Sequence, residues 1–130
     1  MRSADIEVRK TIRGSFPHIR FSQIAKRILG SRYSLSIVIC GDSLARRLNS
    51  TFRKKDYPAN VLSFALSKDE GEIFLNIKKA AREAKALSIK VEKRLAHLFI
   101  HGCLHLKGYK HGTNMDSFEK KILKQFSFKY

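Results

Sequence analysis

The chain has 130 residues, 43% of them hydrophobic, which is enough for a single domain (residues 1–130) with its own core and leaves no room for a second. Lysine and arginine number 27 against 11 acidic residues, and the formal net charge of +16 favours polyanionic partners, although a generally basic proteome would produce the same excess. No stretch has the roughly 18 apolar residues of a membrane span, and no secretory signal is evident, so we expect no membrane partner. Cys40 and Cys103 lack CxxC spacing, and we therefore expect a cytoplasmic protein without disulfides.

Four short strands are predicted, at residues 7–12, 33–40, 61–66 and 72–75. The second is the clearest, since side chains alternate along a strand and four apolar residues then share one face: Tyr33, Leu35, Ile37 and Ile39. The third and fourth strands flank a short connection around residues 67–71. We therefore expect these two strands to form an antiparallel pair.

Five helices are predicted. The first covers residues 17–29, with Pro17 in its first turn, and the second runs to about residue 52 from a cap at Asp42 or Ser43. The other three cover about residues 77–87, 91–107 and 115–125. This order predicts an α+β fold in which a small mixed sheet of about four strands packs with about five helices and a central helix carries a metal site.

The helix at residues 91–107 carries the most informative chemistry. It is apolar around most of its circumference, and His97, His101 and His105 follow one face at four-residue spacing. Two consecutive imidazoles can share a zinc ion, but all three cannot, because His97 and His105 lie about 12 Å apart along the axis. Cys103 lies about 200° away from this face and is expected in the core.

Gly108 is positioned to bring in a third ligand. It is expected to end the helix in a left-handed turn, after which His111 can return toward His105. Three neutral nitrogen donors with an open fourth position are typical of a catalytic zinc site, here formed by His101, His105 and His111. His97 is then expected to have a supporting or packing role. The alternative is that the histidines are separate core or surface groups.

The reaction type depends on what accompanies the histidines. Zinc peptidases of the HExxH type have a glutamate directly after the first histidine, where this chain has Gly102. A phosphodiester substrate suits the basic surface better, because zinc acidifies water and arginine stabilises phosphate charge. The candidates for a general acid or base are Glu72, Asp116 and Glu119, by elimination only.

Three blocks of the sequence resemble the YbeY-type rRNA maturation endoribonucleases. Residues 101–111 resemble the family signature HGxLHLxGYDH, with Lys110 where the family usually has aspartate. Residues 48–64 are similar to a second family block, with Ala59 where a small hydroxyl residue is common. Gly71, Glu72 and Ile73 resemble a Gly-Asp-Ile that opens another strand. Together with the order of elements, the resemblance covers most of the chain.

The resemblance implies a cytoplasmic, zinc-dependent, single-strand-specific endoribonuclease that acts in rRNA maturation (16S-type 3′ end processing) and ribosome quality control. Its implied partners are ribosomal RNA and the small ribosomal subunit. The family's zinc-binding histidines fall on His101, His105 and His111, and three imidazoles would also accept other divalent metals such as nickel.

The resemblance also places substrate contacts. The family arginine implicated in activity falls on Arg53, and the expected further contacts are Lys54, Lys55 and Asn60. The two lysines would equally suit a solvated helix end, and Asn60 could instead hold the turn before a strand. Two other functions compete with the endoribonuclease: a non-catalytic, ribosome-associated RNA-binding protein with a structural metal and, less favoured, a small metallopeptidase.

Overall fold

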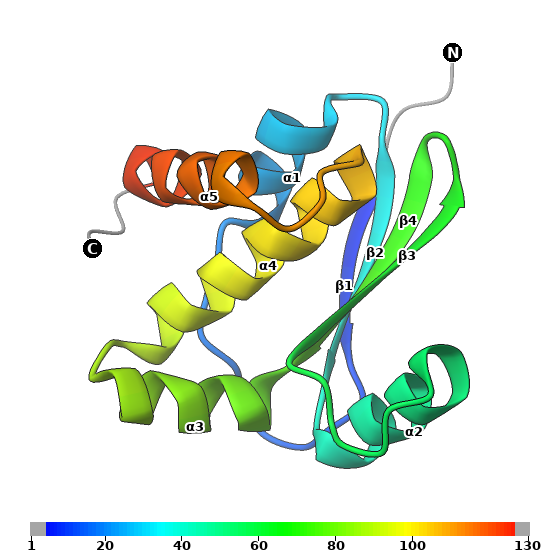
Figure 1. Ribbon diagram of the computed structural model, residues 1–130, viewed down its shortest axis with the longest axis vertical. Helices are drawn as coiled ribbons and strands as arrows, with labels where there is room; N and C mark the ends of the chain where they lie inside the picture. Colours follow the sequence, from blue (N-terminus) through cyan, green and yellow to red (C-terminus); the bar gives the residue numbers. More distant parts are fainter. Residues whose placement is uncertain (1–4, 127–130) are drawn as a thin grey trace.

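The computed structural model describes residues 5–126, in which one sheet is flanked by helices (Figure 1). The strands are β1 (Ile6–Lys10), β2 (Ser34–Cys40), β3 (Val61–Ser67) and β4 (Glu70–Asn76). The helices are α1 (Phe21–Leu29), α2 (Asp42–Arg53), α3 (Ile77–Leu87), α4 (Val91–Lys107) and α5 (Thr113–Gln125). The predicted α+β class, with a small mixed sheet and five helices, is confirmed. In the described residues no helix is both long and apolar enough to cross a membrane.

The sheet has the strand order β1-β2-β4-β3. β2 runs parallel to both β1 and β4, whereas β3 and β4 pair antiparallel through a short turn, as predicted. The central strands β2 and β4 are buried along most of their length, and β1 is exposed over four of its five residues. β1 and β3 form the two edges of the sheet, and β3 is the edge strand that contacts α4.

Side-chain alternation divides the core between the two faces of the sheet. Leu35, Ile37 and Ile73 pack into the larger cluster with residues of α1, α4 and α5, and we call this side the α4 face. Val38 and Phe74 point the other way, into a smaller cluster under α2, and we call this side the α2 face. Figure 1 shows α4 and α2 on opposite sides of the sheet.

α4 lies close to the sheet because residue 102 has no side chain. A Cβ built on Gly102 would lie 2.9 Å from Ser63 Oγ and 3.2 Å from Ile73 Cδ1. The Ser63 hydroxyl donates to the Gly102 carbonyl at 3.0 Å, which ties α4 to β3. Cys103 is fully buried, as predicted from its angle on the helix.

Two predicted helix starts are wrong. α1 begins at Phe21 rather than at Pro17, because the preceding segment runs without regular structure and carries Ile19 into the core, where it is 5% exposed. α2 is capped by the backbone of Gly41, without a side-chain cap. The Asp42 carboxylate instead accepts hydrogen bonds from Arg82. The predicted bounds of α3 and α4 are confirmed, and the other boundaries lie within two residues of the predicted ones.

Candidate metal centre

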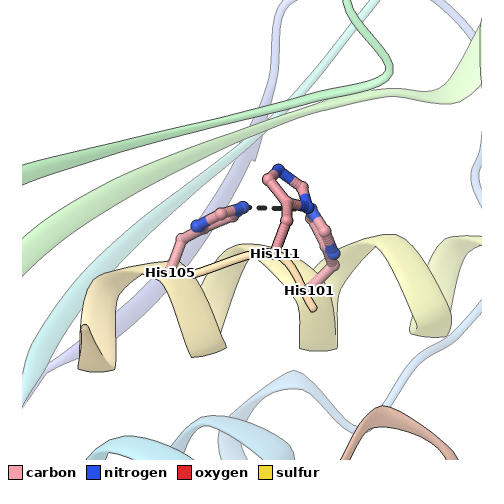
Figure 2. A group of neighbouring side chains, drawn as sticks. All are labelled: His101, His105 and His111. Atoms are coloured by element: carbon pink, nitrogen blue, oxygen red, sulfur yellow. Dashed lines mark hydrogen bonds between the residues drawn. The ribbon is translucent and has the colours of Figure 1, made fainter. Parts of the chain in front are cut away.

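The end of α4 brings three imidazoles together. Gly108 adopts a left-handed conformation, with φ 109° and ψ 3°, and ends the helix as predicted. The Tyr109 N–H donates to the Leu104 carbonyl at 3.0 Å and closes the turn. The chain then returns so that His111 faces His101 and His105 (Figure 2). The sequence expectation that Gly108 would redirect His111 is confirmed.

The spacing of the three rings suits one small cation. One nitrogen from each of His101, His105 and His111 lies within 4.8 Å of the others, and the Nε2 atoms of His101 and His105 are 3.1 Å apart. Two nitrogens at about 2.0–2.1 Å from a tetrahedral zinc ion would be separated by about 3.3 Å. His101 and His105 are half-buried and His111 is exposed, so the cluster is accessible from solvent. The group could therefore hold a metal ion.

The electrostatics of His105 favour its neutral form. Burial is the largest cause of its lowered pKa, followed by the neighbouring His101 and His111 and then by the positive charge of Arg53. A neutral imidazole has the lone pair that a metal needs. Arg53, the exposed last residue of α2, is thus close enough for its charge to act on the histidine cluster.

Glu119 lies behind His101 and is 5% exposed. It accepts hydrogen bonds from His101 Nδ1 at 2.8 Å and from His97 Nε2 at 2.6 Å. Burial alone raises the pKa of Glu119, but the bonds from His101 and His97 outweigh it and lower that pKa to about 2. An anion with both oxygens occupied is a poor general base. His97 stays outside the three-histidine cluster and contacts the same carboxylate as His101.

The other two acid–base candidates differ in position. Glu72 precedes Ile73, which faces α4, so Glu72 points toward the α2 face, where Ser36 is within 3.5 Å of it. It cannot reach the histidines. Asp116 lines a cavity of about 240 Å³ beside His101, together with Asn60, Arg94, His97, Leu98 and Glu119. Of the three candidates, Asp116 is thus the one exposed carboxylate next to the cluster.

Not all of the predicted substrate-binding residues lie next to the three-histidine cluster. Asn60 lines the cavity beside His101, but its amide also donates to Glu83 at 3.2 Å. Lys54 and Lys55 are exposed, and their backbone N–H groups close the end of α2 by bonding to the carbonyls of Ser50 and Asn49. Within residues 5–126 no hydrogen bond connects either lysine side chain to the histidines.

Sequence reasoning missed the support that Glu83 and Arg94 provide. Arg94 pairs with Glu83 at 3.0 Å and approaches His97 Nδ1 at 3.5 Å. The spacing of Arg94 and His97, three residues apart on one helix, was a usable signal, because such residues share a face. Glu83 lies on another helix, and nothing local in the sequence indicates that it would reach Arg94.

Comparison with known proteins identifies the family. The sequence model of the family described as Endoribonuclease YbeY matches residues 2–127. The chain belongs to this family. The resemblance proposed from residues 101–111 and 48–64 is thereby confirmed.

Individual relatives support the same assignment. A protein of Neorickettsia sennetsu named Endoribonuclease YbeY is 36% identical over 109 residues, which cover 75% of this chain and 76% of the relative. A protein of the same name from Ehrlichia chaffeensis is 34% identical over 121 residues, covering 85% and 79%. The solution structure of a protein from Thermotoga maritima is similar with a TM-score of 0.63 and 25% identity, covering 93% of this chain and 91% of the other.

Proposed function

We propose that this chain is a zinc-dependent endoribonuclease that cuts single-stranded RNA. The observation that carries the proposal is the convergence of three imidazole nitrogens within 4.8 Å at an accessible surface. Membership of a family whose curated relatives are named endoribonucleases supports RNA as the substrate. The net charge of +16 supports the same substrate class, since RNA is a polyanion.

The donor set fits zinc. His101, His105 and His111 supply three nitrogen ligands for one ion and leave the fourth position for water or substrate. Nickel and other divalent metals would also be accepted by three imidazoles. When bound, such an ion supplies a Lewis acid that acidifies water and polarises a phosphate oxygen.

Arg53 is the residue we assign to the phosphate. Its guanidinium is always charged and can give two parallel hydrogen bonds to phosphate oxygens, which stabilises the extra charge of the transition state. Lys54 and Lys55 follow it on the same exposed segment and would attract the RNA backbone. Asn60, at the cavity beside His101, would contact the nucleotide next to the cleaved bond.

The cellular role follows from the family. We propose that residues 1–130 form one such domain, which acts in the cytoplasm on ribosomal RNA of the small subunit, in 16S-type 3′ end processing and in ribosome quality control. A metallopeptidase of the HExxH type is disfavoured by packing as well as by sequence. A glutamate at position 102 would meet β3 and β4, because the Cβ of that residue points at Ser63 and Ile73.

Metal analysis combined with cleavage assays tests the proposal. We expect one zinc per wild-type chain, and we expect His111→Ala to lose both the metal and the cleavage of a single-stranded rRNA fragment. His111 is exposed, so its removal leaves the core intact. His18→Ala is the matched control, because His18 lies outside the three-histidine group, and it should keep both properties.

The two competing functions give different results. A non-catalytic RNA-binding protein with a structural metal would bind RNA but show no cleavage in the wild type. Cleavage that persists after His111→Ala, or after complete removal of the metal, would contradict the proposal. Hydrolysis of peptides without any effect on RNA would favour the peptidase.

A further inference from the structure

A row of polar side chains extends from α3 to the candidate metal centre. Glu83 pairs with Arg94 at 3.0 Å, and Arg94 Nη1 lies 3.5 Å from His97 Nδ1. His97 Nε2 is 2.6 Å from Glu119, which is 2.8 Å from His101 Nδ1. The Glu119 side chain is only 6% exposed and that of Arg94 17%. In each contact of this row, one group can donate a hydrogen bond and the other can accept it.

The protonation of each ring follows from its neighbours. An arginine only donates, so Nδ1 of His97 is an acceptor and its proton is on Nε2, which faces Glu119. The Glu119 carboxylate can only accept hydrogen bonds. Its contact with His101 therefore requires that Nδ1 of His101 carries a proton and donates it in the hydrogen bond. His101 then has its lone pair on Nε2, the atom that lies 3.1 Å from His105 Nε2. The row therefore selects the one neutral form of His101 that can bind a metal through Nε2.

A buried carboxylate would be costly without these partners. Removing an ion from water is unfavourable unless it is paired and hydrogen-bonded, and Glu119 meets this condition through two imidazole N–H groups from α4. Its negative charge also lies one ring away from the position where a dication would be bound. The arrangement is that of a carboxylate–histidine–metal triad, in which the carboxylate sets ring orientation and ligand basicity.

We propose that Glu119 is a positioning residue for the ligand His101, and that His97, held by Arg94, positions Glu119 in turn. This inference rests on the three-histidine metal site of the proposed function. It assigns to α5 a part in metal binding although α5 contributes no ligand. It also explains why the histidine row of α4 continues to His97, which lies too far along the helix to share the ion with His105.

The variant Glu119→Gln tests the proposal. Glutamine has the same shape but a single acceptor oxygen, so it cannot accept from both imidazoles, and its NH2 group would oppose the proton on one of them. We expect the zinc dissociation constant to rise about 10- to 100-fold, measured by competition with a chromogenic chelator. Thermal melting of the metal-free variant checks that the fold is retained. Wild-type zinc affinity in a folded Glu119→Gln protein would overturn the proposal.

The matched control is Glu72→Gln, which makes the same change in a half-buried carboxylate on the α2 face. It should bind zinc as the wild type does. An equal loss of affinity in Glu72→Gln would show that the effect is one of total charge, and would also overturn the proposal.

A measurement on the wild type avoids the risk that the variant does not fold. Long-range 1H–15N NMR spectra of the metal-free protein should show His101 with its proton on Nδ1 and His97 with its proton on Nε2. A proton on Nε2 of His101 would contradict the proposal. If the wild type binds zinc and shows these forms but does not cleave RNA, the proposed function fails and the positioning role stands.

Discussion

The two faces of the sheet each hold a carboxylate whose pKa is lowered to about 2, but for different reasons. On the α4 face, Glu119 is buried, and bonds from His101 and His97 overcome the cost of burial. On the side of α2, the Asp42 side chain is 41% exposed. Hydrogen bonds from Arg82 and Asn76 lower its pKa, and burial, which raises the pKa, has a smaller effect. A lowered pKa alone therefore does not indicate a functional carboxylate. The hydrogen-bond partners distinguish the two carboxylates: Glu119 contacts a candidate metal ligand, whereas Asp42 joins α2 to α3.

The two faces also differ in how they contribute to the site. The α4 face has the larger core, in which Leu95, Phe99 and Leu104 are fully buried and hold the histidine helix in place. The α2 face has the smaller cluster and leaves Phe52 64% exposed beside Arg53. We infer that the α4 face supplies the metal ligands and the end of α2 supplies the phosphate contact.

Among variants that keep the three histidines, the largest expected effect comes from removing the contribution of the α2 side. Arg53→Ala should reduce RNA cleavage by about 100- to 1,000-fold, because a charge that stabilises the transition state is lost. Zinc content should not change. Arg53→Lys should recover only part of the rate, since lysine lacks the planar pair of donors. Initial rates on single-stranded RNA, with metal analysis of each protein, provide the measurement.

The control for Arg53 is Arg46→Ala. Arg46 is another exposed arginine of α2, but it pairs with Asp56 at 2.9 Å. It should keep nearly full activity. Equal losses in the two variants would mean that general positive charge, rather than Arg53, is responsible.

The next effect is on the packing of the α4 face. Gly102→Ala places a methyl group 2.9 Å from Ser63 Oγ and 3.2 Å from Val61 Cγ2, so α4 must shift away from β3. We expect the free energy of unfolding to fall by about 1–3 kcal/mol, measured by urea denaturation. Ser50→Ala, at an exposed position of α2, should stay within about 0.5 kcal/mol of the wild type. An unchanged midpoint for Gly102→Ala would mean that the helix is not held against the sheet at this position.

A smaller effect concerns acid stability on the side of α2. Because the pKa of Asp42 is lowered from 3.8 to about 2 in the folded protein, its pairing stabilises the fold above pH 3.8, and this contribution is lost as the pH falls through 2. Asp42→Asn should thus melt below the wild type at pH 7, and the difference should shrink at pH 2. A difference that is the same at both pH values would exclude the carboxylate charge as its cause.

The smallest effect is expected at the cysteines, one on each face. Cys40 and Cys103 are both fully buried, and burial raises the pKa of Cys40 to about 11 and that of Cys103 above its usual value. Neither thiol should react with a thiol reagent in the native protein, whereas both should react in guanidinium chloride. Rapid labelling of the native protein at Cys103 would show that the α4 face opens readily.

The sequence by itself determined the elements and the set of candidate ligands. Four-residue spacing places His101 and His105 on one helical face, and Gly108 tolerates the left-handed turn that returns His111. Alternating apolar residues likewise predicted β2 and its buried face. These features depend on neighbours within a few residues along the chain, and local periodicity and backbone preference are therefore sufficient to predict them.

Only the tertiary structure decided which distant groups meet these elements. Glu119 reaches His101 because α5 packs on α4, and the charge of Arg53 reaches His105 from a helix on the opposite side of the sheet. The start of α1 was set by the burial of Ile19 rather than by Pro17. Such contacts depend on how whole elements pack, and that packing is determined by the complete core rather than by any local pattern of residues.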